Sequence, residues 1–446
     1  MKGMKRKEFI EGGLSAFVLG TTGRLFGADA PSNRVRLAVM GCHPKGRGFA
    51  LMQAAINAGG AEIAVVCDVD SRAREAAAAK VLEMTGKKPD MVGDVRKVLE
   101  RKDIDGLICA APDHWHATAA VWAMKSGKAI YVEKPCTFCA AEGEVLVRVQ
   151  KETNAVFEMG SQRRSATVSL QAMAALKSGI IGKIHNGRCW YQTRRKPLGP
   201  VPSAVVPEWL DWERWQGPAP RTGYRDGLVH YNWHWFRNWG TGECPNNAVH
   251  FIDLARWVLG VDNPVKTTSL GGRLYAKGDG WNEWPDTQTC LWQFAGGELI
   301  TWEGTSCQTY PAPFNSWSGL LLQGEGGNCF FGPNDCTVYD MKGKVIGHWE
   351  PSVSGNATET NNVDPTTVAT VEHMANFISC VRDRNPAGCN QPVTSGVASS
   401  LMAHLGNIAL RTGEVVLSDA KTGRLDPLSA GKDLWGREYE KGWELV

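Results

Sequence analysis

Two patterns of hydrophobic and polar positions alternate along the first third of the chain. Short apolar runs at residues 35–40, 62–67, 106–110 and 129–132 have the length of buried strands. Segments 49–56, 72–84, 95–101 and 118–126 lie between them and favour helices. Strands that alternate with helices at this spacing form βαβ units, whose strands are parallel. The pattern therefore predicts an α/β fold that begins with a doubly wound parallel sheet.

The pattern changes after about residue 183. Runs at residues 287–294, 297–303 and 319–323 alternate around glycine pairs, as antiparallel strands joined by tight turns do. Helical spacing returns at residues 366–384 and 395–411. We therefore expect a first domain at residues 31–160 and an α+β domain at 161–411 with an open, mainly antiparallel sheet. A C-terminal tail follows at residues 412–446.

The first 30 residues have the order of an export signal. A basic head precedes a short apolar stretch, and small residues follow at 28–30. The apolar stretch is too short to span a membrane as a stable anchor. Arg6-Lys7-Glu8-Phe9-Ile10 resembles a twin-arginine signal, which exports folded proteins, although Lys7 replaces the second arginine and Pro31 would hinder cleavage. We expect a periplasmic protein. A frayed N-terminus on a cytoplasmic protein is the alternative.

Charge and cysteine content narrow the class of protein. The net charge of +3 comes largely from four basic residues within the first seven. The rest of the sequence is close to neutral and shows no excess of basic residues that would indicate nucleic-acid binding. No apolar span after residue 30 is long enough to cross a membrane. The thirteen cysteines are scattered, which indicates folding in a reducing compartment rather than a disulfide scaffold. Cys136 and Cys139 have no second ligand pair, so we expect no metal.

A glycine-rich turn at residues 41–48 lies between the first predicted strand and its helix. There the pyrophosphate of a dinucleotide would rest on the helix N-terminus. His43 replaces the second glycine of the usual G-x-G-x-x-G pattern, and Asp68 ends the second strand 27 residues after Gly41. An acid at that position binds ribose hydroxyls and favours NAD over NADP, although Arg72 keeps NADP open. The candidate cofactor residues here are Gly41, His43, Gly46, Arg47, Asp68 and Arg72.

Two further strand ends carry candidate residues. Ala111-Pro112-Asp113-His114-Trp115-His116 follows the third strand and could line a pocket, and no spaced partner completes a metal site there. Glu133-Lys134-Pro135 closes the strand at 129–132, at the sheet edge where ligands of α/β proteins bind. An ammonium group there can stabilise charge on a substrate oxygen, or it can simply reach solvent.

The segment from His230 to Asp253 is rich in histidine, asparagine and tryptophan. A helix is expected at residues 254–259, with His250 and Asp253 ahead of it. Asn246 lies four residues before His250, which places both on one helical face or at the start of the helix. Histidine is the usual general base near neutral pH, so His250 and His234 are candidates, with a core role for His250 as the alternative. Six tryptophans between 209 and 239 suit sugar rings or plain packing. The loop at 196–225 is long enough for a substrate lid.

Together, these motifs resemble the Gfo/Idh/MocA oxidoreductase family over essentially the whole mature chain. The resemblance implies an N-terminal Rossmann domain, and roles for Lys134 and His250 on the substrate hydroxyl. It implies cofactor contacts for Pro112, His114, His116, Glu133 and Lys134, and closure over the nicotinamide by Gln162 and Arg163. Pairing of the open sheet face between subunits is also expected, since family members often form such homo-oligomers.

Two departures from the family shape the functional prediction. The family's Asp four residues before the histidine is Asn246 here, so His234 could share the duties of the base. The segment also resembles the NAD-dependent α-N-acetylgalactosaminidases, which lack the lysine that this chain keeps. We therefore predict an NAD-dependent dehydrogenase of a sugar, glycoside or polyol, with tightly bound cofactor. A redox-assisted glycosidase is the first alternative, and a non-catalytic sugar- or NAD-binding protein is the second.

Overall fold

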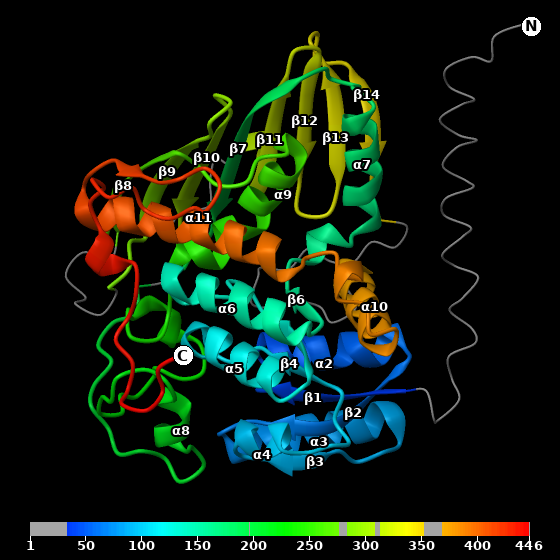
Figure 1. Cartoon of the computed structure of the whole chain (residues 1–446), viewed down its shortest axis with the longest axis vertical. Helices are drawn as coiled ribbons and strands as arrows, with labels where there is room; N and C mark the ends of the chain where they lie inside the picture. The colour runs from blue at the N-terminus through cyan, green and yellow to red at the C-terminus, as the bar shows by residue number, and fades with distance from the viewer. Residues whose placement is uncertain (1–33, 196, 276–282, 308–312, 352–367, 446) are drawn as a thin grey trace, which may run out of the picture.

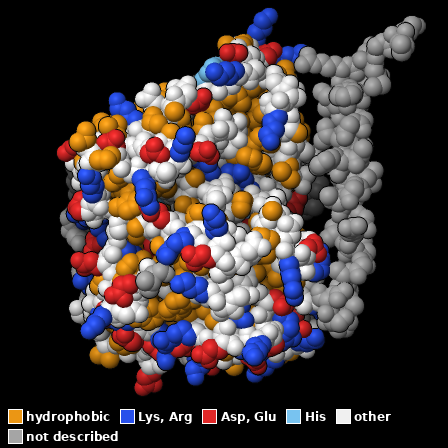
Figure 2. Space-filling view, viewed as in Figure 1, with side chains coloured by type: hydrophobic (Ala, Val, Ile, Leu, Met, Phe, Trp, Pro, Cys, Tyr) orange, Lys and Arg blue, Asp and Glu red, His pale blue; other side chains and the backbone are white. Residues whose placement is uncertain are grey.

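The computed structural model describes residues 34–195, 197–275, 283–307, 313–351 and 368–445 (Figure 1). The predicted export signal at residues 1–30 lies outside these ranges. Within them, no helix is both long enough and apolar enough to cross a bilayer. Figure 2 shows acidic and basic side chains interspersed over the face in view, without a large patch of one sign.

The first sheet has six parallel strands, as the sequence pattern predicts. Its order is β3-β2-β1-β4-β5-β6, so the direction of winding reverses between β1 and β4, where open α/β sheets bind ligands. The strands are β1 (Val35–Met40), β2 (Ala61–Cys67), β3 (Asp90–Val92), β4 (Gly106–Cys109), β5 (Ala129–Val132) and β6 (Phe157–Met159). The helices that connect them are α2 (Arg47–Ala58), α3 (Ser71–Thr85), α4 (Val95–Leu99), α5 (Asp113–Lys125) and α6 (Ala140–Thr153).

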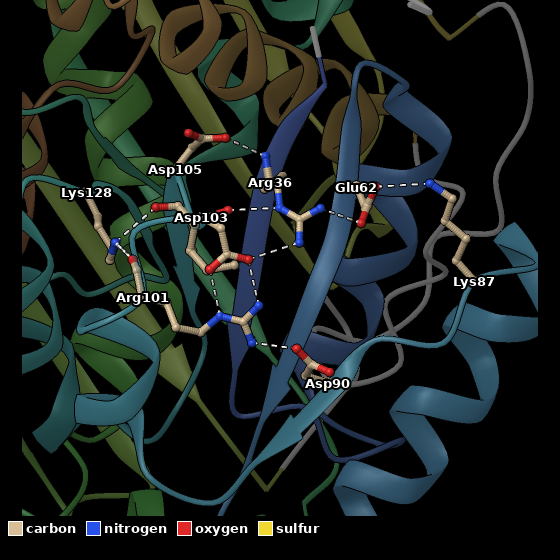
Figure 3. A network of polar contacts seen from close by, with 9 residues as sticks. Arg36, Glu62, Lys87, Asp90, Arg101, Asp103, Asp105 and Lys128 are labelled. Atoms are coloured by element: carbon tan, nitrogen blue, oxygen red, sulfur yellow. Dashed lines mark hydrogen bonds and ion pairs between the residues drawn. The ribbon is translucent and has the colours of Figure 1, made fainter. Parts of the chain in front are cut away.

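A network of ion pairs joins the amino ends of these strands (Figure 3). Arg36 in β1 binds Glu62 in β2 at 2.9 Å and Asp103, just before β4, at 3.2 Å. Arg101 binds Asp103 at 2.7 Å and Asp90, the first residue of β3, at 2.6 Å. Ion pairs between charged side chains thus occupy the edge of the sheet formed by the amino ends of the strands. The opposite edge, at the carboxyl ends, is where a ligand site is expected.

The second sheet has nine strands in the order β14-β13-β12-β11-β7-β10-β9-β8-β15. All neighbours are antiparallel except β7 and β10, which run parallel. This confirms the prediction of an α+β domain with a mainly antiparallel sheet. The strands are β7 (Ile184–Gln192), β8 (Lys266–Gly272), β9 (Thr287–Gln293), β10 (Leu299–Thr305), β11 (Ser318–Gly324), β12 (Gly327–Phe331), β13 (Cys336–Asp340), β14 (Val345–Trp349) and β15 (Val416–Leu417).

One face of this sheet packs on helices and the other is open. Trp302 in β10 and Leu322 in β11 are fully buried and share a core with Ile252 of α9 (Val249–Leu259). Helix α11 (Val393–Thr412) contacts the same side, α7 (Thr167–Lys177) contacts β13 and β14, and α10 (Val368–Arg382) packs on α2. The open face carries exposed apolar side chains, among them Leu270 in β8 and Leu291 in β9.

Two helices begin earlier than the sequence pattern predicts. Helix α5 begins at Asp113 rather than near residue 118, because Pro112 serves as its N-cap and the polar first turn is buried among neighbours. Helix α9 begins at Val249 rather than at residue 254, and a π-helical turn at Cys244–Ala248 precedes it. His250 therefore lies within the first turn of α9 and not ahead of the helix.

A buried ion pair ties α9 to the short helical turn Gln162–Arg164 that follows β6. Asp253, 1% exposed, accepts from Arg164 Nε at 2.8 Å and Nη2 at 2.9 Å, and also from Gln391 and Ser399. Burial opposes ionisation, but the charge of Arg164 outweighs it, so the pKa of the Asp253 carboxyl lies below its ordinary value. This contact fixes the turn of α9 that carries His250.

Replacing Asp253 with asparagine should therefore destabilise the protein strongly. Asp253→Asn leaves Arg164 buried without a counter-charge, so the free energy of unfolding should fall by about 3–5 kcal/mol at pH 7, measured by urea unfolding. The difference from wild type should shrink as the pH falls through the lowered pKa, because wild-type Asp253 is then protonated as well.

Asp262→Asn is the matched control for this substitution. Asp262 is 88% exposed in its side chain and lies 3.8 Å from Arg256, so its loss should change stability by less than about 0.5 kcal/mol. Equal stability of the two variants would contradict the role given to Asp253.

Candidate active site

A cavity of about 980 Å³ follows the carboxyl ends of the first sheet and is closed from above by the second domain. Its floor comes from the loops after β1, β2, β4 and β5. Its roof comes from the end of β7, the segment 230–235 and the start of α9. The predicted residues that line it are Gly41, His43, Gly46, Arg47, Asp68, Pro112, His116, Glu133, Lys134, Gln162, His234, Asn246 and His250.

The glycine-rich turn packs tightly against neighbouring backbone at the start of α2. Gly41 has φ +81°, and a side chain there would press on the backbone of Ala110 at 2.6 Å. A side chain at Gly48 would meet the Gly41 carbonyl at 2.0 Å. Gly46 caps the helix without a side chain, so the first N–H groups of α2 lack a side-chain cap. The turn therefore fits an anionic group such as a pyrophosphate.

Asp68 ends β2 at the floor of the cavity. Its carboxylate accepts from the backbone N–H of Cys42 at 2.7 Å and of Asp70 at 3.0 Å. Burial raises the pKa of this carboxyl, and the backbone donors oppose the shift. The carboxylate is thus held in place beside the glycine turn, where an acid of this fold meets ribose hydroxyls.

His43 and Arg72 are each engaged by the second domain. The His43 ring stacks on His230 with centroids 4.1 Å apart, and His230 Nε2 lies 2.8 Å from Asp70. Burial and the neighbouring His230 lower the pKa of His43 to about 4, so its ring is neutral at pH 7. Arg72 binds Asp70 and covers the Trp209 ring at 3.4 Å, and it does not line the cavity.

Lys134 lies where the two domains meet. Its ammonium group donates to Asn246 Oδ1 at 2.7 Å and also to the Asn246 carbonyl. Burial lowers the pKa of Lys134, and the neighbouring carboxylates of Glu133 and Asp113 oppose the shift. Glu133 in turn binds Arg47 at 2.9 Å. The lysine is therefore held by an amide of the second domain and does not merely reach solvent.

Two neutral histidines share this part of the cavity. His234 donates from Nδ1 to the Tyr231 carbonyl, and its buried Nε2 has no hydrogen-bond partner among the described residues. Burial lowers the pKa of His234 and of His250 well below the ordinary value, and the charge of Lys134 acts in the same direction on both. Each ring can therefore accept a proton from a bound molecule, within reach of a cation that would stabilise an oxyanion.

Besides Arg72, two further predicted cofactor contacts lie outside the cavity wall. His114 is fully buried between the carbonyls of Trp215, 3.0 Å from Nε2, and Trp239, 3.3 Å from Nδ1, and burial lowers its pKa to about 3. Arg163 donates to the carbonyls of Gly332 and Pro333 instead of pointing at the cavity, because Phe251 and the β12–β13 turn hold its guanidinium group. His116 does line the cavity, with its ring nitrogens 2.7 Å from the Pro135 carbonyl and 2.8 Å from that of Ala111.

Several lining residues were not singled out from the sequence. Tyr191 and Thr193 come from the end of β7, and Arg195 follows them and binds the buried Glu243 at 3.2 Å. Trp443 reaches the cavity from the C-terminal tail. The alternation of β7 could have indicated which side Tyr191 faces, but nothing in the sequence places the tail. No group of three potential metal ligands occurs in the described part of the chain.

Comparison with known protein families matches both domains. Residues 35–161 match the Gfo/Idh/MocA model described as an oxidoreductase family with an NAD-binding Rossmann fold. Residues 185–270 match the model for the C-terminal alpha/beta domain of the same oxidoreductase family. Two consecutive segments in the expected order thus support the division into a nucleotide domain and a second domain.

Among curated proteins, the chain is similar to glycosyl hydrolase family 109 proteins. One from Shewanella putrefaciens (strain CN-32) is 27% identical over 329 residues, which cover 68% of this chain and 65% of that protein. Another, from Shewanella sp. (strain W3-18-1), is 27% identical over 149 residues, 32% of each chain. The chain therefore matches less than two thirds of the length of these relatives.

Solved structures share the fold at low sequence identity. A myo-inositol 2-dehydrogenase from Lactobacillus plantarum is 20% identical with a TM-score of 0.61, covering 86% of this chain and 99% of that one. A levoglucosan dehydrogenase, solved with NADH and levoglucosan, is 17% identical with a TM-score of 0.62 over the same shares.

The ring of His234 should keep one tautomer across the neutral range. Nitrogen NMR of histidine-labelled protein should show Nδ1 protonated and Nε2 unprotonated from pH 8 down to pH 6, because burial and the charges of Arg195 and Lys134 disfavour the imidazolium. The His234→Gln variant identifies the resonance. A doubly protonated ring at pH 6 would contradict the assignment of Nε2 as an acceptor.

Proposed function

The chain belongs to the Gfo/Idh/MocA oxidoreductase family, and on that premise we propose that it oxidises a ring hydroxyl of a sugar, glycoside or polyol with NAD. One observation carries the proposal. The Lys134 ammonium group lies in the same cavity as the acceptor nitrogen of His234 and the ring of His250, beside the glycine turn. Removal of a hydroxyl proton needs an acceptor and a nearby cation, and both are present.

The residues of the cavity fit a dinucleotide. Gly41 and Gly48 allow the tight turn into α2, whose first N–H groups have no side-chain cap, and Asp68 offers a carboxylate at the end of β2. When bound there, NAD supplies the carbon that accepts a hydride from the substrate. Asp68 and Asp70 would repel a 2′-phosphate, and the guanidinium of Arg72 is already paired with Asp70, so we propose NAD rather than NADP.

The protein's own groups perform the proton chemistry. His250, assisted by His234, accepts the proton of the substrate hydroxyl at a ring nitrogen that is neutral in the free protein. Lys134 donates to the same oxygen as it gains negative charge. Asn246 holds the lysine through its amide oxygen, which orients the ammonium group without adding a charge. The aromatic residues of segment 230–235 exclude water from this end of the cavity.

The relatives of glycosyl hydrolase family 109 support a second candidate. Transient oxidation of a sugar, elimination of the glycoside and re-reduction would use the same groups and return the hydride to the substrate. The two functions differ in net products. An aryl glycoside should release phenol without net NADH if the protein is a glycosidase, whereas a dehydrogenase should yield net NADH or a keto-sugar.

We also propose that the protein is exported and keeps its cofactor tightly bound. The N-terminal residues support export, and the free buried cysteines suit folding before transport. Outside the cytoplasm NAD is not replenished, so a retained cofactor would be required.

The exposed apolar side chains of the open sheet face, such as Leu270, support self-association through that face.

Removing the lysine ammonium should cut turnover without loss of cofactor. Lys134→Met should lower kcat by about 10²- to 10³-fold, because the oxyanion loses its cation, while NAD affinity stays within about threefold. Lys97→Met, on the exposed surface of α4, is the control and should leave kcat unchanged. Turnover of Lys134→Met equal to wild type would refute the role of Lys134.

Restoring an acid beside the lysine should move the pH profile. In Asn246→Asp the new carboxylate favours the ammonium form, so the pKa of Lys134 should rise and activity should persist to higher pH. Asn246→Ala removes the amide without adding charge and should not extend the alkaline limb. The measurement is kcat/KM against pH, and identical profiles for the two variants would contradict this account.

A further inference from the structure

We propose that the C-terminal tail supplies, through Trp443, one wall of the pocket for the adenine base, so that cofactor retention depends on the last residues of the chain. The inference rests on the proposed use of NAD. It assigns a role to a part of the molecule that no motif predicts and that lies far in sequence from the nucleotide domain.

The tail returns from the second domain to the first. After β15 it leaves the second sheet, and in Figure 1 the red segment descends past α6 toward α5 and α8 (Trp212–Gln216). The Trp435 carbonyl accepts from the N–H of Ala141 at 3.0 Å, and Arg437 donates to the His114 carbonyl at 3.1 Å. The tail is therefore fixed to the starts of both α5 and α6.

The last turn of the tail is anchored from two sides. The hydroxyl of Tyr439 donates to Glu142 at 2.8 Å. The N–H of Glu440 donates to the Pro218 carbonyl at 3.0 Å, and the Glu440 carboxylate accepts from the N–H of Arg221 at 3.2 Å. These contacts join the tail both to the nucleotide domain and to the loop of the second domain that carries α8.

These anchors seat Trp443 on α5 at the edge of the cavity. Its ring centroid lies 5.3 Å from that of Trp115, with the planes at 86°, and 5.4 Å from that of Trp122. The ring is partly buried against the core of the nucleotide domain and lines the cavity. A flat aromatic surface is thus held in place at the cavity, with the guanidinium groups of Arg96 and Arg221 each 5.9 Å from the ring centroid.

The position in the cavity identifies the ligand group. A dinucleotide with its pyrophosphate on the turn at Gly41 and a ribose at Asp68 has its nicotinamide toward Lys134 and its adenine on the other side of Asp68. That other side is lined by the loop Gly93–Arg96, Trp115, Arg214 and Trp443. Trp443 therefore lies beside Arg96, at the adenine end of the cavity.

The chemistry of this wall suits a neutral aromatic base. Asp94 is paired with Arg96 at 2.8 Å and with Arg214 at 3.4 Å, and Arg214 also binds Asp211, so the two acidic and two basic groups near the pocket balance. The hydrogen bond from Arg96 holds the pKa of the Asp94 carboxyl below its ordinary value, which keeps the pair ionised at pH 7. Trp115 is only 5% exposed, so the surface that remains for contact is the part of the Trp443 ring that is not buried, on which an adenine ring can pack.

Binding of nucleotide fragments tests the inference directly. After removal of cofactor, Trp443→Ala should bind AMP and NAD about tenfold more weakly than wild type by calorimetry, because one stacking surface is lost. Its affinity for nicotinamide mononucleotide should not change. Purified Trp443→Ala should also retain a smaller fraction of NAD than wild type, measured by chromatography of the acid-released nucleotide.

Two further variants distinguish loss of the contact between Trp443 and adenine from loss of stability of the folded protein. Leu445→Ala alters a tail residue that packs on the same core but does not line the cavity, and it should bind AMP as wild type does. Trp443→Leu keeps an apolar side chain for packing but removes the ring, so it should weaken AMP binding even if Trp443→Ala proves unstable.

The outcomes distinguish this inference from the proposed function. If wild type binds NAD but Trp443→Leu binds AMP equally well, or if AMP and nicotinamide mononucleotide weaken together, the role of the tail is wrong. If wild-type protein binds neither NAD nor AMP, the proposed function itself fails.

Discussion

The contact between Lys134 and Asn246 is the constraint on which the site depends. The ammonium group lies at the carboxyl end of β5, and it donates a hydrogen bond to Asn246 in the turn that leads into α9. A partly buried cation needs hydrogen-bond acceptors, and Asn246 of the second domain provides two of them. The docking of the two domains therefore completes the surroundings of this lysine. The Arg164–Asp253 pair supports it from the other side of α9.

An amide in place of the family's acid changes the electrostatics of the centre. With Asn246 as partner, the lysine is oriented but its charge is not cancelled across that hydrogen bond, and burial together with that charge lowers the pKa of the nearby histidines, which keeps them neutral. Neutral rings are able to accept protons, so the substitution is compatible with proton abstraction. The cation also becomes more available to a developing oxyanion, because no carboxylate competes for it across the same hydrogen bond.

The sequence predicted the parallel sheet, the second sheet and most helices, because periodicity and turn residues act locally. It also indicated Gly41, Asp68, Lys134 and His250, which lie at strand ends or helix starts. It could not place His114 or Arg163 correctly, since burial between carbonyls of distant segments decides where each side chain points. The contributions of Tyr191 and Trp443 depend on how the domains and the tail fold together, and no local pattern encodes them.

The packing of α10 on α2 has a consequence for how the chain acquires its structure. Helix α10 and the core residue Phe377 cover a face of the nucleotide domain that is encoded more than three hundred residues earlier, and β15 completes the second sheet only near the end of the chain. A nascent chain on the ribosome would therefore expose apolar surface on the first domain until α10 has emerged. Such non-local pairing slows folding, and a chaperone that shields α2 until α10 emerges would have a defined binding site.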